Sequence, residues 1–128
     1  MKIHHLALYV RDLERTKAFY ETYFGAVSND QYHNPKTGLR TYFLSFGNGC
    51  KIEIMTRPNA TGADNGQEQL GYTHLAFCVA DADAVDALTN RLRDDGYIVC
   101  SEPRRTGDGY YESCVLDPEG NQIELVGG

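Results

Sequence analysis

Two histidines and two glutamates recur at nearly the same spacing in this chain. His74 follows His5 by 69 positions (74 − 5), and Glu124 follows Glu53 by 71 positions (124 − 53). Each glutamate lies between aliphatic residues, where a buried carboxylate is unfavourable unless it is paired or coordinated. Two imidazoles and two carboxylates suit an octahedral Ni, Co, Mn or Fe ion, or Zn with expanded coordination. The pattern predicts a divalent metal site made by these four residues.

Both pairs belong to a longer internal repeat. Residues 5–12 read HLALYVRD and residues 74–81 read HLAFCVAD, with five of the eight positions identical. Residues 49–54 (GCKIEI) align in the same way with residues 120–125 (GNQIEL). The alignment with His74 selects His5 rather than its neighbour His4 as the candidate ligand. Each half of the chain is therefore expected to supply one His from its first strand and one Glu from its last strand.

The elements that position these residues also repeat. In the first half, hydrophobic periodicity and turn chemistry predict a strand over 3–10 and a helix over 13–24. Asp12 is expected to cap this helix and Gly25 to end it. Further strands are predicted over 26–32, 39–46 and 50–56, with a hairpin turn at 47–49. This half reads β-α-β-β-β.

The second half repeats that order. A strand is predicted over 72–79, then a helix capped by Asp83 and closed by Gly96. Strands are expected over 97–100, 110–116 and 122–126, with a loop over 103–109 and a turn over 117–121. One domain over 1–128 is therefore expected, with modules of about 1–57 and 72–128 joined by a polar linker over 58–71.

Composition narrows the functional class. A net charge of −6 over 128 residues argues against a nucleic-acid partner. No apolar run approaches the roughly 20 residues of a membrane span, and no apolar signal region follows Met1, so a cytoplasmic protein without membrane contact is expected. The four cysteines form no Cys-x-x-Cys pair, and each lies in or beside an apolar run. They are expected to be reduced and buried. These four cysteines are Cys50, Cys78, Cys100 and Cys114.

The chain resembles the vicinal oxygen chelate superfamily, and most closely its small glyoxalase I (lactoylglutathione lyase)-like members. The resemblance spans the whole chain and rests on His5 before Val10-x-Asp12, Phe19-Tyr20…Phe24-Gly25, Glu53, His74 and Asp117-Pro118-x-Gly120-Asn121-x-Ile123-Glu124. It implies an α+β, glyoxalase-like fold: two tandem βαβββ modules forming an incomplete-barrel metal cup. In short members a homodimer usually completes the cup. The sequence leaves open whether the metal lies within one chain or between two.

The resemblance also implies a chemistry. A small oxygenated substrate would chelate the metal through vicinal oxygens, and the metal would stabilise an enediolate as a Lewis acid. Glu124 is the expected base that moves a proton between adjacent carbons, and Glu53 is the alternative. A metal-dependent lyase or isomerase of the lactoylglutathione lyase type is therefore predicted.

Two positions depart from glyoxalases that use glutathione. Tyr9 occupies the place of an arginine on the first strand, and Arg57 occupies the place of an asparagine four residues after Glu53. Use of glutathione is thus questioned. Arg57 is a candidate for an anionic substrate group or a solvated surface charge, as are Arg104 and Arg105. Tyr9, Met55 and Cys78 are expected to line the substrate pocket or to pack in the core.

Three other functions on the same fold compete with the lyase. A drug-binding resistance protein would not need the four ligands. A fosfomycin-type thiol transferase or a small ring-cleaving dioxygenase would use two His and one Glu, which leaves Glu53 unexplained.

Overall fold

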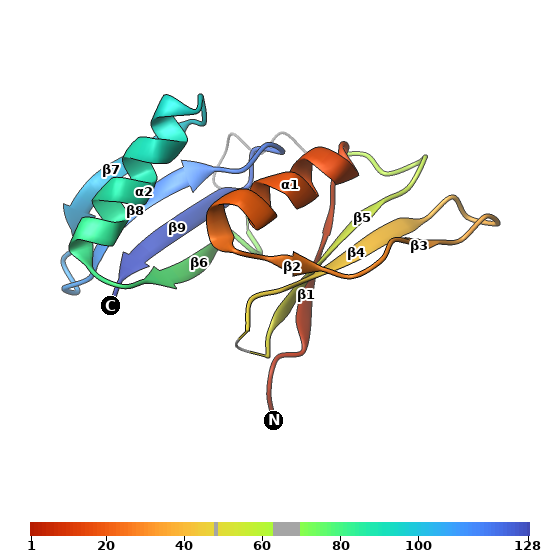
Figure 1. The fold of residues 1–128 in the computed structure, drawn as a ribbon, viewed down its shortest axis with the longest axis horizontal. Coiled ribbons are helices and arrows are strands. Elements are labelled where there is room, and N and C mark those ends of the chain that lie inside the picture. The colour runs from red at the N-terminus through yellow and green to blue at the C-terminus, as the bar shows by residue number, and fades with distance from the viewer. Residues whose placement is uncertain (48, 63–69) are drawn as a thin grey trace. The chain divides into compact units, whose positions relative to one another are not determined.

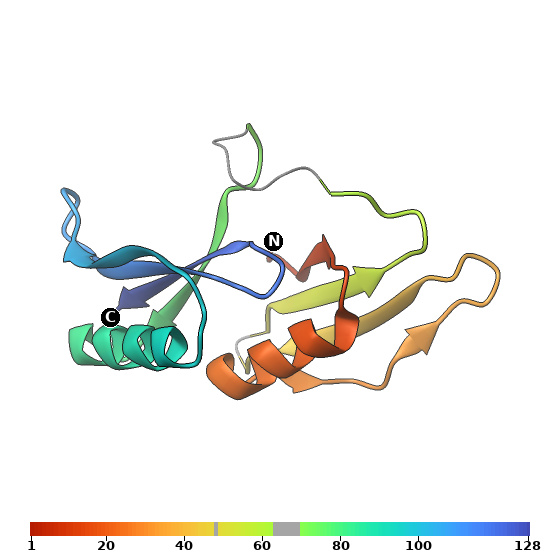
Figure 2. The same cartoon turned by 90° about the horizontal axis from the view of Figure 1, so that it is seen from above.

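The computed structural model describes residues 1–47, 49–62 and 70–128. The chain forms two compact units, Met1–Ala63 and Asp64–Gly128. In the described residues each unit has one helix on one face of one mixed sheet (Figures 1 and 2). Neither sheet closes into a barrel among the strands that are described. The predicted α+β class is confirmed.

The sheet of unit 1 brings the first and last strands of the repeat together. Its strand order is β1-β5-β4-β2, and β3 also pairs with β4. The β1–β5 pairing is parallel and the others are antiparallel. The elements are β1 (His5–Tyr9), α1 (Leu13–Phe24), β2 (Val27–Ser28), β3 (Tyr32–His33), β4 (Arg40–Ser45) and β5 (Lys51–Thr56).

Helix α1 has the boundaries that the sequence predicts. The Asp12 side chain accepts a hydrogen bond from the Arg15 backbone N–H at 3.0 Å, which satisfies a helix-end donor. Gly25 ends the helix in the left-handed conformation at φ 64°, where a side chain would be unfavourable. The helix covers β2, β4 and β5 and buries a core on that side of the sheet. Core members include Leu13, Phe19, Tyr20, Leu44, Ile52 and Ile54.

The strand predicted over 26–32 is two short strands. Between β2 and β3 the Asn29 side chain accepts from the Phe43 backbone N–H at 2.7 Å, and the Asn29 backbone N–H donates to the Phe43 carbonyl at 3.1 Å. A side chain thus replaces part of the strand ladder at this point. The predicted hairpin turn includes residue 48, which lies outside the described residues.

Unit 2 repeats the plan with four strands. Its order is β6-β9-β8-β7, with β6 and β9 parallel and the other neighbours antiparallel. Helix α2 packs on β7, β8 and β9 and buries Val85 and Leu92 against Val115, Ile123 and Leu125. The elements are β6 (His74–Val79), α2 (Ala82–Asp94), β7 (Val99–Arg105), β8 (Tyr111–Leu116) and β9 (Gln122–Gly127).

Two predictions for unit 2 are wrong in detail. Asp81, and not Asp83, caps α2: its carboxylate accepts from the Ala84 backbone N–H at 2.9 Å. Strand β7 runs on through Pro103 to Arg105, where a loop was expected. Because β7 is an edge strand with two register shifts against β8, it tolerates a proline and lacks regular alternation.

Part of the predicted linker over 58–71 lies outside the described residues, and the module boundaries stay a prediction. Among the helices of the described residues, none has the length and apolar character needed to span a membrane.

Candidate functional site

The predicted pair of unit 1 forms on neighbouring parallel strands. Ala7 of β1 lies opposite Glu53 of β5 in the register, and His5 is two positions before Ala7 on the same face. The small Ala7 side chain leaves room for the two larger ones to meet. His5 Nε2 lies 3.6 Å from Glu53 Oε2, and both side chains are partly exposed.

The pair of unit 2 has the same construction. Ala76 of β6 lies opposite Glu124 of β9, and His74 is two positions before Ala76. His74 Nε2 lies 3.0 Å from Glu124 Oε2. The sequence repeat is therefore also a repeat of strand register, and it places an imidazole beside a carboxylate in each unit.

Both imidazoles have a second polar neighbour on the other ring nitrogen. The Nδ1 atom of His5 lies 2.8 Å from that of His4, and His74 Nδ1 lies 2.9 Å from the Thr73 hydroxyl. In both units these contacts leave Nε2 directed at the glutamate. Such a second contact fixes the tautomer and the orientation of a histidine.

The donor atoms are those that divalent ions use, namely imidazole nitrogen and carboxylate oxygen. No cluster of three or more metal-binding side chains occurs in the described parts of the chain. Each unit therefore supplies half of the predicted set of ligands. The chemistry of the residues fits a metal that draws ligands from two such pairs.

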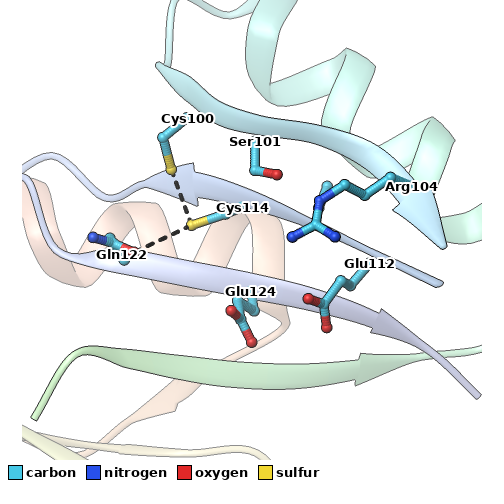
Figure 3. Close-up of a pocket in the computed structure, with 8 residues that line it drawn as sticks. Cys100, Ser101, Arg104, Glu112, Cys114, Gln122 and Glu124 are labelled. Atoms are coloured by element: carbon cyan, nitrogen blue, oxygen red, sulfur yellow. Dashed lines mark hydrogen bonds between the residues drawn. The ribbon is translucent and has the colours of Figure 1, made fainter. Parts of the chain in front are cut away.

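Glu124 also lines a hollow of about 310 Å³ in unit 2, shown in Figure 3. The other walls come from β7, β8 and the start of β9, and most of them carry polar groups. Arg104, one of the candidate anion-binding residues, is among them, whereas Arg105 is not. The lining residues are Cys100, Ser101, Arg104, Glu112, Ser113, Cys114, Gln122 and Glu124.

Sequence reasoning missed most of these walls, although part of the signal was present. Glu112, Cys114 and Gln122 have the same strand parity as Glu124 within the turn-linked pair β8–β9, and Cys114 lies opposite Glu124. Counting back from the turn at 117–121 would have placed them beside Glu124. The position of Cys100 could not be predicted in this way, because Cys100 lies where the β7–β8 register shifts.

Tyr9 and Arg57 meet at a second hollow, of about 340 Å³, in unit 1. Tyr9 of β1 lies opposite Met55 of β5. Met55 shares a sheet face with Glu53, because the two residues are two positions apart on the same strand. The strand face that carries the His5–Glu53 pair thus leads to this hollow. Its lining residues are Tyr9, Thr37, Arg57, Pro58, Asn59 and Ala60.

Cys78 is exposed on β6, on the face that also carries His74, and it is not one of the walls of the unit 2 hollow. The four cysteines are thiols, and the expectation that all are buried is wrong for Cys78 and Cys100. Of the four cysteines, Cys114 is buried and Cys50 is half-buried. Burial, then the hydrogen bond with Cys100 and the charge of Glu124, raise the pKa of the Cys114 thiol to about 12. Cys114 is therefore a neutral thiol at physiological pH.

The turn before β9 holds Glu124 in place. Asp117 is buried, and its Oδ1 accepts from the backbone N–H groups of Glu119 and Asn121, each at 2.9 Å. Its Oδ2 accepts from the Asn121 side-chain amide at 3.0 Å. A carboxylate with three donors fixes the start of the strand that carries Glu124.

The family profile of the Glyoxalase/Bleomycin resistance protein/Dioxygenase superfamily matches residues 2–125. The chain belongs to this superfamily. It is 27% identical over 127 residues to a lactoylglutathione lyase of Salmonella typhimurium, with 98% of this chain and 92% of that protein covered. It is 26% identical over 123 residues to the glutathione transferase FosA of Serratia marcescens, with 96% and 78% covered.

A solved structure gives the same result for the fold. The glyoxalase family protein from Enterococcus faecalis superimposes with a TM-score of 0.80 at 27% identity, covering 98% of this chain and 96% of that one. The predicted glyoxalase-like fold is confirmed.

Proposed function

We propose that this member of the superfamily is a divalent-metal-dependent lyase or isomerase of the glyoxalase I type. It would move a proton between adjacent carbons of a small oxygenated substrate. The observation that carries the proposal is the pair of His–Glu contacts, His5–Glu53 and His74–Glu124, built in the same strand register in both units.

The metal would be held by His5, Glu53, His74 and Glu124. Bound there, Zn, Ni, Co, Mn or Fe supplies Lewis-acid stabilisation of negative charge on the substrate oxygens. The four donors come as two pairs, and retaining all four favours this function over one that needs two His and one Glu.

Glu124 is the proposed proton carrier. It combines contact with His74 with a place in the wall of the unit 2 hollow, where a substrate carbon can approach its carboxylate. Glu53 has an imidazole partner but is not among the walls of the unit 1 hollow. The difference supports Glu124 over Glu53 as the base.

The unit 1 hollow is the proposed place for the distal part of the substrate. Arg57 and Tyr9 would offer a cation and a phenol to it, in place of the asparagine and arginine of glutathione-using enzymes. The substrate is therefore proposed to be a small oxygenated compound or its adduct with a thiol.

A homodimer is proposed as the active form. Each chain has one donor pair per unit, so two chains can form two complete sites by combining unit 1 of one chain with unit 2 of the other.

Metal binding tests the ligand assignment. Purified protein should bind about one divalent ion per chain, and His74→Ala should weaken binding at least about 10-fold. His33→Ala is the matched control, because His33 is an exposed strand histidine of β3 outside the proposed set. Full metal occupancy in His74→Ala, measured by elemental analysis after dialysis, would contradict the assignment.

Turnover tests the reaction. The metal-loaded protein is incubated with methylglyoxal and glutathione, and thioester formation is followed. Product formation that requires the metal supports the glyoxalase reaction with glutathione. Metal binding without turnover leaves the ligand assignment standing and directs the search to other 2-oxo compounds and other thiols.

A further inference from the structure

Two thiols of unit 2 lie in direct contact on neighbouring strands. The Sγ atoms of Cys100 on β7 and Cys114 on β8 are 2.9 Å apart, and both line the hollow that contains Glu124 (Figure 3). Cys100 is exposed, whereas Cys114 is buried. The Cys100 thiol is thus accessible to a reagent, whereas the Cys114 thiol is shielded from solvent.

The local backbone suits a bond between these sulfurs. A disulfide has an S–S distance of about 2.05 Å, so the atoms need to approach by about 0.9 Å. Cys100 lies between Val99 and Ser101, where the pairing with β8 shifts register. A bulged edge strand can make such a movement without breaking a regular ladder on both of its sides.

We propose that Cys100 and Cys114 form a reversible oxidation site that reacts with small-molecule disulfides. The proposal is independent of the metal and of the lyase reaction. It assigns chemistry to two residues that the proposed function does not use.

The reaction balances as two thiol–disulfide exchanges. The Cys100 sulfur, as its thiolate, attacks one sulfur of a disulfide RSSR, and one RS⁻ leaves and takes up the proton that Cys100 released. The Cys114 sulfur then attacks Cys100 in the mixed disulfide and displaces the second RSH. Overall, the two protein thiols are oxidised to one disulfide, and RSSR is reduced to two RSH.

The order follows from exposure. Cys100 is the thiol that a solvent-borne disulfide can reach, and Cys114 is the thiol that completes the bond. The high pKa of Cys114 slows the second step, but the attack is intramolecular, and such proximity greatly raises the effective concentration of a nucleophile.

The bond would change the wall of the hollow beside Glu124. Cys114 lies opposite Glu124 in the β8–β9 register, and its sulfur also lies 3.8 Å from Gln122 Oε1. Oxidation would remove two S–H groups from this wall and tie β7 to β8.

Peptide mapping of the native chain tests the proposal. After treatment with glutathione disulfide, the protein is denatured, its remaining thiols are alkylated, and it is digested with trypsin without reduction. The sequence places Cys50, Cys78, Cys100 and Cys114 in four separate tryptic peptides, and those of Cys100 and Cys114 are 94–104 and 106–128. The expected product is 94–104 joined to 106–128, with two hydrogens lost within one chain and with both peptides restored by a thiol reductant.

Cys100→Ser is the decisive variant, since Cys100 is exposed and its replacement spares the core. It should yield no joined peptide and an alkylated Cys114. Cys78→Ser is the matched control: Cys78 is also an exposed strand cysteine of unit 2, and its loss should leave the joined peptide unchanged.

Two results would overturn the proposal. One is a wild-type chain in which Cys100 stays a thiol or stops at the mixed disulfide. The other is a link from Cys100 to Cys78 or to a second chain in place of Cys114.

Discussion

The His74 Nε2 atom lies 3.0 Å from Glu124 Oε2. The two residues come from the parallel neighbours β6 and β9, where Ala76 lies opposite Glu124 and two positions after His74. Unit 1 has the same arrangement with His5 and Glu53 at 3.6 Å. Neither contact depends on a loop, because all four residues lie within strands. Side chains on paired strands are held more firmly than side chains on loops, which is what a site for a metal ion requires.

Replacing Glu124 by Gln separates its two proposed roles. The amide oxygen can still bind a metal, but the side chain can no longer take up a proton. We expect kcat to fall about 100-fold or more, and by more than metal occupancy falls, when turnover is measured per metal-loaded chain. Glu112→Gln is the control, because Glu112 lines the same hollow and pairs with Val126 in the β8–β9 register, away from His74. Equal losses in the two variants would contradict the role of Glu124.

A mixture of two inactive variants tests where the site is assembled. One variant carries His5→Ala with Glu53→Gln, and the other carries His74→Ala with Glu124→Gln. If each site combines unit 1 of one chain with unit 2 of its partner, a mixed dimer has one intact site and one site in which all four proposed ligand positions are substituted.

We therefore expect activity to return when the two proteins are unfolded together and refolded as a mixture. The mixture should regain up to about a quarter of the wild-type activity, because about half of the dimers are mixed and each has one of two sites. Each variant refolded alone is the control. A mixture without activity, although mixed dimers are detected by mass, would place each site within one chain.

The contact between Tyr42 and Glu14 predicts a loss of stability at high pH. The Tyr42 hydroxyl donates to Glu14 Oε1 at 2.6 Å and joins β4 to α1. This hydrogen bond, together with burial, raises the pKa of Tyr42 above its ordinary value of 10.0. Above pH 10 the unfolded chain releases this proton more readily than the folded chain, so the free energy of unfolding falls as pH rises.

Tyr42→Phe should lose about 1–2 kcal/mol at pH 8, and the difference from wild type should shrink by pH 11. Urea unfolding at the two pH values measures it. Tyr32→Phe is the control, because Tyr32 is exposed on β3. A constant difference between the two pH values would show that the phenol proton does not contribute.

The Asp117 turn predicts a link between stability and metal binding. Asp117→Ala would leave three donors without their carboxylate, and we expect a loss of about 3 kcal/mol in the free energy of unfolding. Asp117→Asn should lose less, since an amide oxygen still accepts hydrogen bonds. Metal affinity should fall in the same order, and exposed Asp30→Ala should change neither quantity.

The internal repeat made the main part of the fold and the candidate ligands predictable. It set His5 against His74 and Glu53 against Glu124, and the parallel pairing of β1–β5 and β6–β9 follows the same alignment. The repeat also aligns Asp12 with Asp81. Read one step further, it indicates Asp81 as the α2 cap, which the assignment to Asp83 overlooked.

Other features have no regular period for a sequence to display. The bulges of β7 shift its alternation, so the contact of Cys100 with Cys114 depends on a backbone irregularity. The Asn29 side chain accepts a hydrogen bond from the Phe43 backbone N–H and so interrupts the strand between β2 and β3. This contact can be found only when the position of Phe43 is known. Local patterns describe one segment at a time, and these contacts depend on two.

The parallel pairing within each unit also bears on how such a protein can evolve. Each half keeps its own imidazole and carboxylate on its own pair of strands, so a single codon change at Glu53 leaves the His74–Glu124 geometry untouched. A duplicated ancestor could thus lose one ligand and acquire a different chemistry without rebuilding its architecture. This chain keeps a His–Glu pair in each unit, in the same strand register.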